Sequence, residues 1–254
     1  MNINQQVVLV TGASRGLGAQ IARRFHEEGA CVIINYYKNE AKAQQLVNDL
    51  GGDQVIALQA DVRNAEEVKA LCAQAKAHFG ASITTIVNNA LVDFSFNGDA
   101  RPTLDDITWH AFQQQFEGSV QGALNTYQAV KDDMQQQQFG RIINIGTNLF
   151  QHPVVPYHDY NTSKAALLSM TRNMAYELGK YGIHANMVSG GLLYKTDASS
   201  ATPDAVFDVI EQGTPLGKVT TPDDVAGAVL FFASPWSKGI TGQNVIVDGG
   251  LVMQ

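Results

Sequence analysis

Short runs rich in β-branched residues alternate with helix-like segments along the whole chain, and this alternation restricts the fold more than any other feature. Runs such as VVLV, CVIINY and RIINIG are apolar at consecutive positions, so both faces of each strand must be buried. Strands that are buried on both faces and separated by helices form parallel sheets with helices on each side. The sequence therefore predicts an α/β fold built on one doubly wound parallel sheet.

The expected elements follow one another without a break that would separate domains. No linker, internal repeat or low-complexity segment interrupts them, so we expect a single domain over residues 1–254. Strands are expected at QVVLVT, CVIINY, QVIALQA, ITTIVNN, RIINIG, IHANMVSG and QNVIVDGG. Helices are expected after the loop that follows ITTIVNN and over residues 20–28, 42–50, 65–79 and 159–178.

Charge and composition exclude several classes of partner. The net charge is −7 and no run of lysine or arginine occurs, so we expect no binding to nucleic acid or to an anionic membrane. The absence of a signal-peptide pattern and of a membrane-length apolar run favours a cytoplasmic protein. Cys31 and Cys72 have no cysteine or histidine at metal-ligand spacing, so we predict neither a disulfide nor a metal site.

A glycine-rich loop, TGASRGLG, follows the first expected strand and leads into a helix. Gly12, Gly16 and Gly18 allow a ligand to approach the backbone closely, and the N–H groups of the helix N-terminus stabilise a phosphate charge. A tight turn without a ligand is the alternative reading of these glycines taken alone. Their place in the first strand-to-helix connection favours a dinucleotide cofactor.

The spacing Gly-x3-Gly-x-Gly resembles that of the short-chain dehydrogenase/reductase family, and further motifs extend the resemblance along nearly the whole chain. They are ADV at 60–62, NNA at 88–90, the pair Tyr160 and Lys164, and TGQNVIVDGG near the C-terminal end. The resemblance implies a Rossmann-type fold and a nicotinamide cofactor. The cofactor-binding residues that it implies are Gly12, Ser14, Arg15, Gly16, Leu17, Gly18, Asn35, Tyr36, Asp61, Val62, Asn89, Ala90, Tyr160 and Lys164.

The same resemblance implies a place for each part of the cofactor. Asp61 has an alternative role as the cap of the next helix, and Asn88 has one as the end of a strand. In the family pattern the phosphates lie above Gly16 and Leu17, the adenine faces Asp61 and Val62, and the ribose lies beside Asn89 and Ala90.

The end of the second strand, INYYKN, indicates which nicotinamide is used. A site selective for NAD carries a carboxylate about 20 residues past the glycines, and here no acid occurs before Glu40. A 2′-phosphate would meet no repulsion at Asn35 or Tyr36, and Arg15 and Lys38 supply positive charge. We therefore predict NADPH/NADP+ rather than NADH, with a solvated loop cation as the alternative role of Arg15.

Tyr160 and Lys164 lie four residues apart and share one helix face. An ammonium and the positive nicotinamide of an oxidised cofactor both favour phenolate, so we predict a lowered tyrosine pKa and proton donation from Tyr160 to the developing alkoxide. The resemblance implies that Lys164 also holds the ribose hydroxyls. It places a hydroxyl thirteen positions before the tyrosine, at Thr147, with the adjacent Asn148 as a weaker candidate.

Three positions depart from the family pattern. Ser119 stands where many relatives have an asparagine that supports a water-linked proton relay, so we include Ser119 among the catalytic candidates. Leu91 in NNAL narrows the space near the nicotinamide, and SGG at 189–191 replaces a Pro-Gly and loosens the loop that follows. A cofactor-binding regulator with weak or lost catalysis is therefore an alternative to an enzyme.

The sequence as a whole, including TPLGKVTTPDDVAGAVLFFAS, most resembles the 3-oxoacyl reductases of fatty acid biosynthesis that act on acyl carrier protein. The resemblance implies a substrate lid over about residues 190–220, including Gly191 and Leu192, and a homotetramer. Phe94 and Phe96 offer aromatic walls for a substrate, with loop packing as the alternative.

The carrier of the acyl group is left open by the charge pattern. The helix end KDDMQQQQFGR carries Asp132 and Asp133, so its complementarity to an acidic carrier protein is poor. A coenzyme A thioester or a small ketone competes with acyl carrier protein as the substrate. A dehydrogenase of a secondary alcohol such as a sugar, polyol or steroid is the remaining enzymatic alternative.

Overall fold

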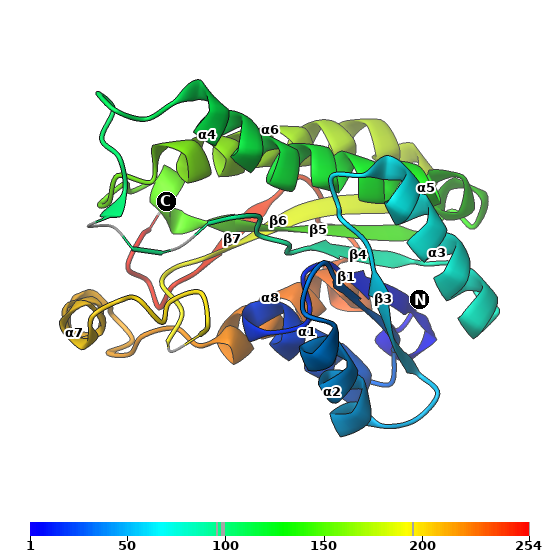
Figure 1. Ribbon diagram of the computed structural model, residues 1–254. Coiled ribbons are helices and arrows are strands. Elements are labelled where there is room, and N and C mark those ends of the chain that lie inside the picture. Colours follow the sequence, from blue (N-terminus) through cyan, green and yellow to red (C-terminus); the bar gives the residue numbers. More distant parts are fainter. Residues whose placement is uncertain (95, 98–99, 195, 254) are drawn as a thin grey trace.

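The computed structural model describes residues 1–94, 96–97, 100–194 and 196–253. Its centre is one seven-stranded parallel sheet with the strand order β3-β2-β1-β4-β5-β6-β7 (Figure 1). The order reverses between β1 and β4, and in such sheets a ligand crevice forms at the carboxyl ends of the strands at that point. The strands are β1 Val7–Val10, β2 Cys31–Tyr36, β3 Val55–Gln59, β4 Thr85–Asn88, β5 Gly140–Thr147, β6 Ile183–Gly190 and β7 Asn244–Val247.

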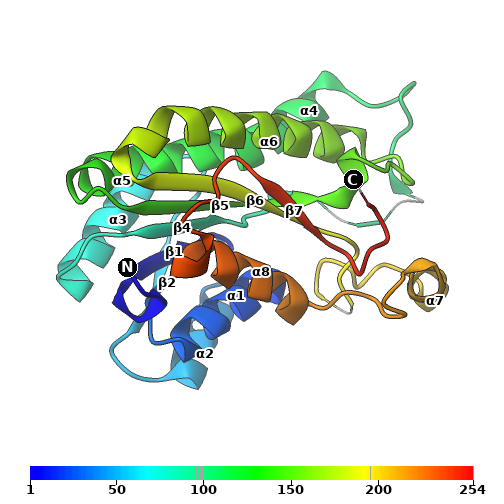
Figure 2. The same cartoon turned by 180° about the vertical axis from the view of Figure 1, so that it is seen from behind.

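Helices cover both faces of the sheet, as the sequence predicted. In Figure 1, α1, α2 and α8 lie on one face and α3, α5 and α6 on the other, and Figure 2 shows the same layers from behind. Helix α4 lies beside α6, and α7 lies away from both helix layers. The helices are α1 Gly16–Glu27, α2 Glu40–Leu50, α3 Ala65–Phe79, α4 Trp109–Phe116, α5 Gly122–Gln136, α6 His158–Leu178, α7 Asp204–Gly213 and α8 Pro222–Ala233.

Several predicted helix boundaries were wrong by a few residues. The first helix begins at Gly16, inside the glycine loop, rather than at residue 20, because its first turn is built from the small residues of the loop itself. Helix α2 begins at Glu40, two residues before the expected 42, whereas the expected helix from about residue 159 to 178 is confirmed by α6, His158–Leu178. The predicted α3 boundaries are confirmed, since Asn64 caps its first turn and Gly80, with φ 63°, ends it.

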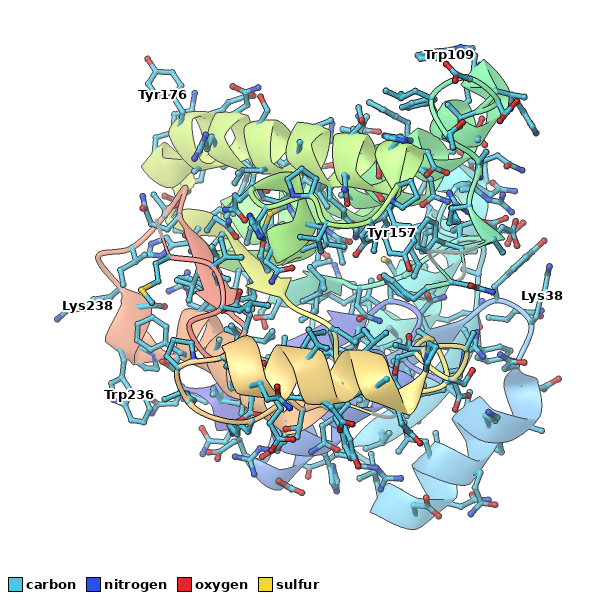
Figure 3. All side chains as sticks on the ribbon, turned by 90° about the vertical axis from the view of Figure 1, so that its left-hand side faces the viewer. Lys38, Trp109, Tyr157, Tyr176, Trp236 and Lys238 are labelled. Atoms are coloured by element: carbon cyan, nitrogen blue, oxygen red, sulfur yellow. The ribbon has the colours of Figure 1, made fainter. Side chains whose placement is uncertain are left out.

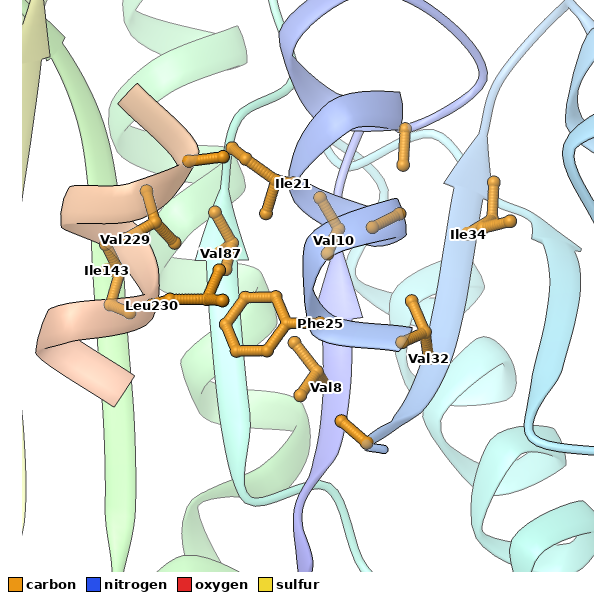
Figure 4. Close-up of a cluster of buried hydrophobic side chains, with 14 of the residues drawn as sticks. Val8, Val10, Ile21, Phe25, Val32, Ile34, Val87, Ile143, Val229 and Leu230 are labelled. Atoms are coloured by element: carbon orange, nitrogen blue, oxygen red, sulfur yellow. The ribbon is translucent and has the colours of Figure 1, made fainter. Parts of the chain in front are cut away.

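Alternating side chains of the central strand divide between the two helix layers. Val8 and Val10 of β1 face α1, where the fully buried Phe25 packs against them (Figure 4). Val7 and Leu9 face the opposite layer. Complete burial of a Phe side chain contributes about 1.5–3 kcal/mol, so Phe25 helps to fix α1, and with it the glycine loop, on the sheet.

Candidate active site

Tyr160 and Lys164 lie on the first turns of α6, against the carboxyl end of β5. Both are buried, with 5% and 3% of their surface exposed. The Lys164 ammonium donates a hydrogen bond to the Ile145 carbonyl oxygen at 2.8 Å, and its nitrogen lies 5.7 Å from the centre of the Tyr160 ring. The predicted pair therefore shares one face of one helix, as the i, i+4 spacing required.

Thr147 is the last residue of β5, and its side chain contacts the Tyr160 phenol from the sheet. Its hydroxyl shares a hydrogen bond with the Tyr160 phenol and accepts a second from the Leu149 backbone N–H at 3.2 Å. Thr147 is 4% exposed, so both hydroxyls lie in a place from which bulk water is largely excluded. A carbonyl oxygen placed between these two hydroxyls would receive two hydrogen bonds.

The electrostatics of Tyr160 differ from the sequence-based expectation. Burial raises the pKa of the phenol above its ordinary value, and the hydrogen bond with Thr147 only partly opposes that effect. Burial also lowers the pKa of Lys164 to about 8, which weakens the positive charge that was expected to favour phenolate. The predicted lowering of the tyrosine pKa was therefore wrong for the protein without cofactor, because desolvation raises the pKa more than the hydrogen bond with Thr147 lowers it.

The glycine loop fits a phosphate ligand. Gly12 and Gly16 have φ of 62° and 55°, and a side chain at Gly12 would come within 2.9 Å of the Ala90 backbone. A side chain at Gly16 would meet only the Thr196 Cβ, at 3.9 Å, so the backbone there is open to a ligand. The side chain of Arg15, the residue before α1, does not cap the first turn of the helix. The backbone N–H groups of that turn are therefore available to a phosphate.

The residues expected beside the ribose hold the glycine loop in place. The Asn89 amide donates to the Thr11 and Gly12 carbonyl oxygens at 2.9 and 3.3 Å. The Ala90 backbone N–H donates to the Thr11 hydroxyl at 3.0 Å. These bonds join the end of β4 to the loop after β1, so Asn89 and Ala90 fix the shape of the glycine loop. Ser14 lies half-buried in the loop, and Leu17 packs against the apolar core behind it.

Asn35 acts on the loop rather than at its surface. Its side chain is 2% exposed, accepts from the Gly12 backbone N–H at 3.2 Å and donates to the Ala60 carbonyl oxygen at 3.1 Å. The adjacent Tyr36 is 7% exposed and is hydrogen-bonded to Glu40, and burial raises its pKa. Asn35 and Tyr36 are therefore buried beneath the glycine loop, and the residues that follow them form the exposed surface at the end of β2.

Tyr37, Lys38 and Arg63 form that open surface. The Lys38 nitrogen and the Arg63 guanidinium lie 5.2 and 5.8 Å from the centre of the Tyr37 ring, and Lys38 projects from the edge of the molecule (Figure 3). Arg63 donates to the Asp61 carboxylate at 2.7 Å, and this bond holds the pKa of Asp61 below its usual value. The alternative role of Asp61 as a helix cap was wrong, because Asn64 is the cap.

Arg15 meets an acidic partner that the sequence analysis missed. Its guanidinium lies 3.5 Å from the Asp197 carboxylate, which also accepts a hydrogen bond from Lys42 at 2.7 Å. The bond from Lys42 is the main cause of the lowered pKa of Asp197. Two cations from the loop and α2 thus converge on one carboxylate of the 191–203 segment. The cluster could not be predicted from the sequence because Asp197 lies more than 150 residues after Arg15 and Lys42.

Ser119 lies in a single π-turn, Glu117–Gln121, between α4 and α5. Its hydroxyl is 3.5 Å from that of Ser163, which donates to the Tyr160 carbonyl oxygen at 2.8 Å. A cavity of about 10 Å³ separates Ser119 from Lys164 and is also lined by Val62 and Asn88. That volume is close to the minimum for one water molecule, so the space left by a serine at this position is small.

The residues predicted to contact substrate divide into two groups. Leu91 and Leu192 are half-buried next to the site. The Asn148 amide instead donates to the buried Asp248 carboxylate at 2.9 Å, and a side chain at Gly191 would come within 3.0 Å of the Asp248 Cβ. Asn148 is thus committed to Asp248, which the sequence analysis missed, and Thr147 is the better placed of the two neighbours.

Aromatic side chains surround the ring of Tyr160. Phe94 stacks on it with a centroid distance of 4.7 Å and an interplanar angle of 27°, while Phe96 meets it edge-on at 5.5 Å. Tyr157, the residue before α6, contacts Phe94 and Phe96 at centroid distances of 5.2 and 5.9 Å. Phe94 and Phe96 were predicted as walls from the sequence, whereas Tyr157 was not.

Comparisons with known proteins agree with this architecture. A family model described as Enoyl-(Acyl carrier protein) reductase matches residues 12–252. The 3-oxoacyl-(acyl-carrier-protein) reductase FabG of Staphylococcus aureus is 32% identical over 251 residues, covering 96% of this chain and 97% of that protein. The (2S)-((R)-hydroxy(phenyl)methyl)succinyl-CoA dehydrogenase subunit BbsD of Thauera aromatica is 33% identical, with 98% of each chain covered.

A solved structure matches at the level of the whole fold. The gluconate 5-dehydrogenase of Burkholderia cenocepacia, in complex with NADP and tartrate, has a TM-score of 0.86 and 30% sequence identity. The match covers 97% of this chain and 94% of that one. Within the described residues, no helix is long and apolar enough to span a membrane, and no group of three or more acidic, His or Cys side chains could hold a metal ion.

Proposed function

The chain belongs to the short-chain dehydrogenase/reductase family, and we propose that it is an NADPH-dependent reductase of 3-oxoacyl thioesters. The observation that carries the proposal is the convergence of the Thr147 hydroxyl and the Tyr160 phenol at the carboxyl end of β5. Lys164 lies one helical turn further along α6. The reduction adds a hydride and a proton to a ketone and gives an alcohol.

The residues of the chain divide the work of that reaction. Thr147 orients the carbonyl oxygen, and Tyr160 donates the proton to the alkoxide as it forms. The raised pKa of Tyr160 keeps the phenol protonated before the reaction, which suits the reducing direction. Lys164 would hold the ribose hydroxyls with the N–H donors that its hydrogen bond to the Ile145 carbonyl leaves over. NADPH supplies the hydride when it is bound.

The charges around the glycine loop support NADPH as the cofactor. The first turn of α1 offers its N–H groups to the phosphates. No acidic residue occurs in β2 or in the three residues after it, and the carboxylate that follows, Glu40, is hydrogen-bonded to Tyr36. Arg15 and Lys42 flank the loop, with Lys38 and Arg63 further along the same edge. Asp197 and Asp61 pair with three of these four cations, and the excess of positive charge favours an additional phosphate over a bare ribose hydroxyl.

Two relatives support a thioester substrate. One is named a 3-oxoacyl-(acyl-carrier-protein) reductase and the other acts on a succinyl-CoA derivative. The half-buried Leu91 and Leu192 and the aromatic rings beside Tyr160 would border an acyl group. Asp132 and the Lys76-paired Asp133 lie near the end of α5, which does not favour docking of an acidic carrier. We therefore propose coenzyme A rather than acyl carrier protein as the carrier.

NADPH consumption with acetoacetyl thioesters of coenzyme A and of acyl carrier protein tests this function. Simple ketones serve as comparison substrates and the Tyr160→Phe variant as the control for site-specific turnover. Tyrosine-dependent consumption that is faster with the coenzyme A thioester than with the acyl carrier protein thioester is the expected result. Turnover confined to simple ketones would remove the thioester from the proposal, and binding of NADPH without any turnover would favour a cofactor-binding regulator.

A dehydrogenase of a polyol or sugar acid is the second candidate. It is favoured by the structural likeness to the gluconate 5-dehydrogenase. Oxidation of gluconate with NADP+ by the same preparation discriminates it from the thioester reductase. We further propose that the segment around 190–220, which contains α7, is a substrate lid, and that the protein is a cytoplasmic homotetramer.

A further inference from the structure

The loop after β4 places an aromatic ring directly on the tyrosine of the site. Phe94 lies on the face of the Tyr160 ring at 4.7 Å, and Phe96 and Tyr157 close the sides of the stack. Stacking on the ring face leaves the hydroxyl end of the phenol free to share its hydrogen bond with Thr147. Phe94, Phe96 and Tyr157 therefore form an aromatic wall beside the Tyr160 hydroxyl, and they leave the place between Tyr160 and Thr147 to the substrate carbonyl.

An ion pair next to Tyr160 holds this wall. The Arg101 guanidinium donates two hydrogen bonds to the two oxygens of the Asp159 carboxylate, at 2.5 and 2.6 Å. Its planar group also lies over the Phe94 ring, 4.4 Å from the ring centre. Asp159 is the residue before Tyr160 and is 2% exposed. A single guanidinium thus joins the start of α6 to the ring that covers the tyrosine.

This pair is the most buried ion pair among the described residues, followed by Arg63–Asp61, whose side chains are 25% and 15% exposed. The side chains of Arg101 and Asp159 are 17% and 3% exposed, whereas those of the Arg23–Asp49 pair are 37% and 38% exposed. Exposed pairs contribute little, whereas breaking a buried pair by removing one partner is costly because the other charge is left buried without compensation. The Arg101–Asp159 pair therefore serves to position the loop after β4, because it fixes that loop on the start of α6.

We propose that Arg101 and Asp159 hold Phe94 on Tyr160, and that this wall selects ketones with an aryl group next to the reacting carbonyl. The inference rests on the proposed reductase function and names the substrate class of the same site. Tyr160 and Arg101 cover the faces of Phe94, so an aryl group gains contact area and edge-to-face contacts at the ring edges of Phe94 and Phe96, whereas a hydroxylated chain would lose its water there without gaining partners. Arg101 is a positioning residue in this scheme, since it acts through Phe94.

A matched pair of substrates measures the selection. The coenzyme A thioesters of 3-oxo-3-phenylpropionate and acetoacetate differ only by phenyl against methyl on the ketone. We expect wild type to favour the phenyl substrate in kcat/KM by at least about tenfold, and Phe94→Ala to lose most of that ratio through KM. Intrinsic reactivity cancels when the ratios of variant and wild type are compared. A wild-type ratio at or below one would overturn the selection.

Variants of the ion pair test the positioning. Arg101→Met with Asp159→Asn removes both charges, so no lone carboxylate is left buried, and should reduce the phenyl-to-methyl ratio as Phe94→Ala does. Arg101→Lys keeps the charge but not the planar contact and should reduce it partly. Arg23→Met, in the exposed pair, should leave the ratio unchanged. Ratios equal to wild type in the Arg101 variants would overturn the positioning role.

A second measurement does not depend on turnover. Ultraviolet titration of the phenols, with Tyr160→Phe subtracted, reports when Tyr160 ionises. Loss of the Phe94 cover admits water, so Phe94→Ala and the charge-free double variant should both ionise at lower pH than wild type. An unchanged titration in both would overturn the wall. Absence of all ketone turnover would instead reject the proposed function, and the titration would still decide whether Arg101 and Phe94 cover Tyr160.

Discussion

The ammonium of Lys164 lies 5.7 Å from the centre of the Tyr160 ring and donates its hydrogen bond to the Ile145 carbonyl oxygen at 2.8 Å. In this arrangement the lysine is fixed by the backbone of β5, and the phenol is held by Thr147 and covered by Phe94. The two members of the pair therefore have different anchors. Their effects can be separated by substitution.

Replacing Tyr160 by Phe removes the proton donor and keeps the ring that stacks on Phe94. We expect turnover to fall by about a hundredfold or more, since general acid catalysis contributes that much, while NADPH affinity is largely kept. Steady-state rates and NADPH titration measure the two effects. Tyr176→Phe is the matched control, because Tyr176 lies on the same helix and is 94% exposed. Equal rates in Tyr160→Phe and wild type would exclude Tyr160 as the proton donor.

Thr147 is tested by two substitutions that differ in one group. Thr147→Ser keeps the hydroxyl and should retain most activity, whereas Thr147→Val keeps the shape and should lower kcat/KM by about 10- to 1000-fold. Thr147→Val also removes the acceptor of the Leu149 backbone N–H, so its melting temperature must be measured alongside. A Val variant as active as the Ser variant would show that the hydroxyl does not act on the substrate.

Arg15 and Asp197 should shift cofactor preference in opposite directions. Arg15→Ala removes a cation and should weaken NADPH binding more than NADH binding. Asp197→Asn removes the carboxylate that occupies Arg15 and Lys42, so it should strengthen NADPH binding relative to NADH by several-fold. Fluorescence titrations with both cofactors give the ratio. Shifts of the same sign in the two variants would show that Asp197 does not compete with the 2′-phosphate.

Lys164 should make the free energy of unfolding depend on pH. Its pKa is about 8 in the folded protein and 10.5 when unperturbed, so between these values the unfolded chain binds more protons and stability rises with pH. The charged, buried amine destabilises the fold fully below about pH 8 and no longer does so above about pH 10.5. Lys164→Met removes this cost of roughly 1–3 kcal/mol.

Urea unfolding of Lys164→Met and wild type at about pH 7 and about pH 10 checks this dependence. The variant should gain most at the lower pH, and its advantage should shrink at the higher one. Lys131→Met, at an exposed position of α5, is the control and should show no such trend. A constant difference between Lys164→Met and wild type across the range would mean that the amine stays charged in the fold.

Features that depend on neighbours in the sequence were predictable. The alternation of apolar runs and helical spacing predicted the parallel sheet, because each strand and helix must bury its own apolar face. Gly12 and Gly16 were found because a glycine-rich loop between a strand and a helix lets a phosphate approach the backbone, and both have positive φ in the structure. Tyr160 and Lys164 could be placed together because helical spacing puts residues i and i+4 on one face.

Features that depend on distant segments were not predictable. Asn35 was assigned to the cofactor, yet in the fold it binds Gly12 from behind. Arg15 was expected to be free for a phosphate, yet it meets Asp197. Neither contact leaves a periodic signal, because side chains from separate loops meet only after the sheet has formed.

The residue pattern alone established the doubly wound sheet, the glycine loop and the shared helix face of Tyr160 and Lys164, since each is set by local geometry and by the burial of apolar faces. Tertiary structure decided the electrostatics and the surroundings of that face. Burial, rather than the lysine charge, sets the direction of the Tyr160 pKa, and the Arg101–Asp159 pair places Phe94 on its ring. Desolvation and long-range packing exist only once distant segments exclude water together.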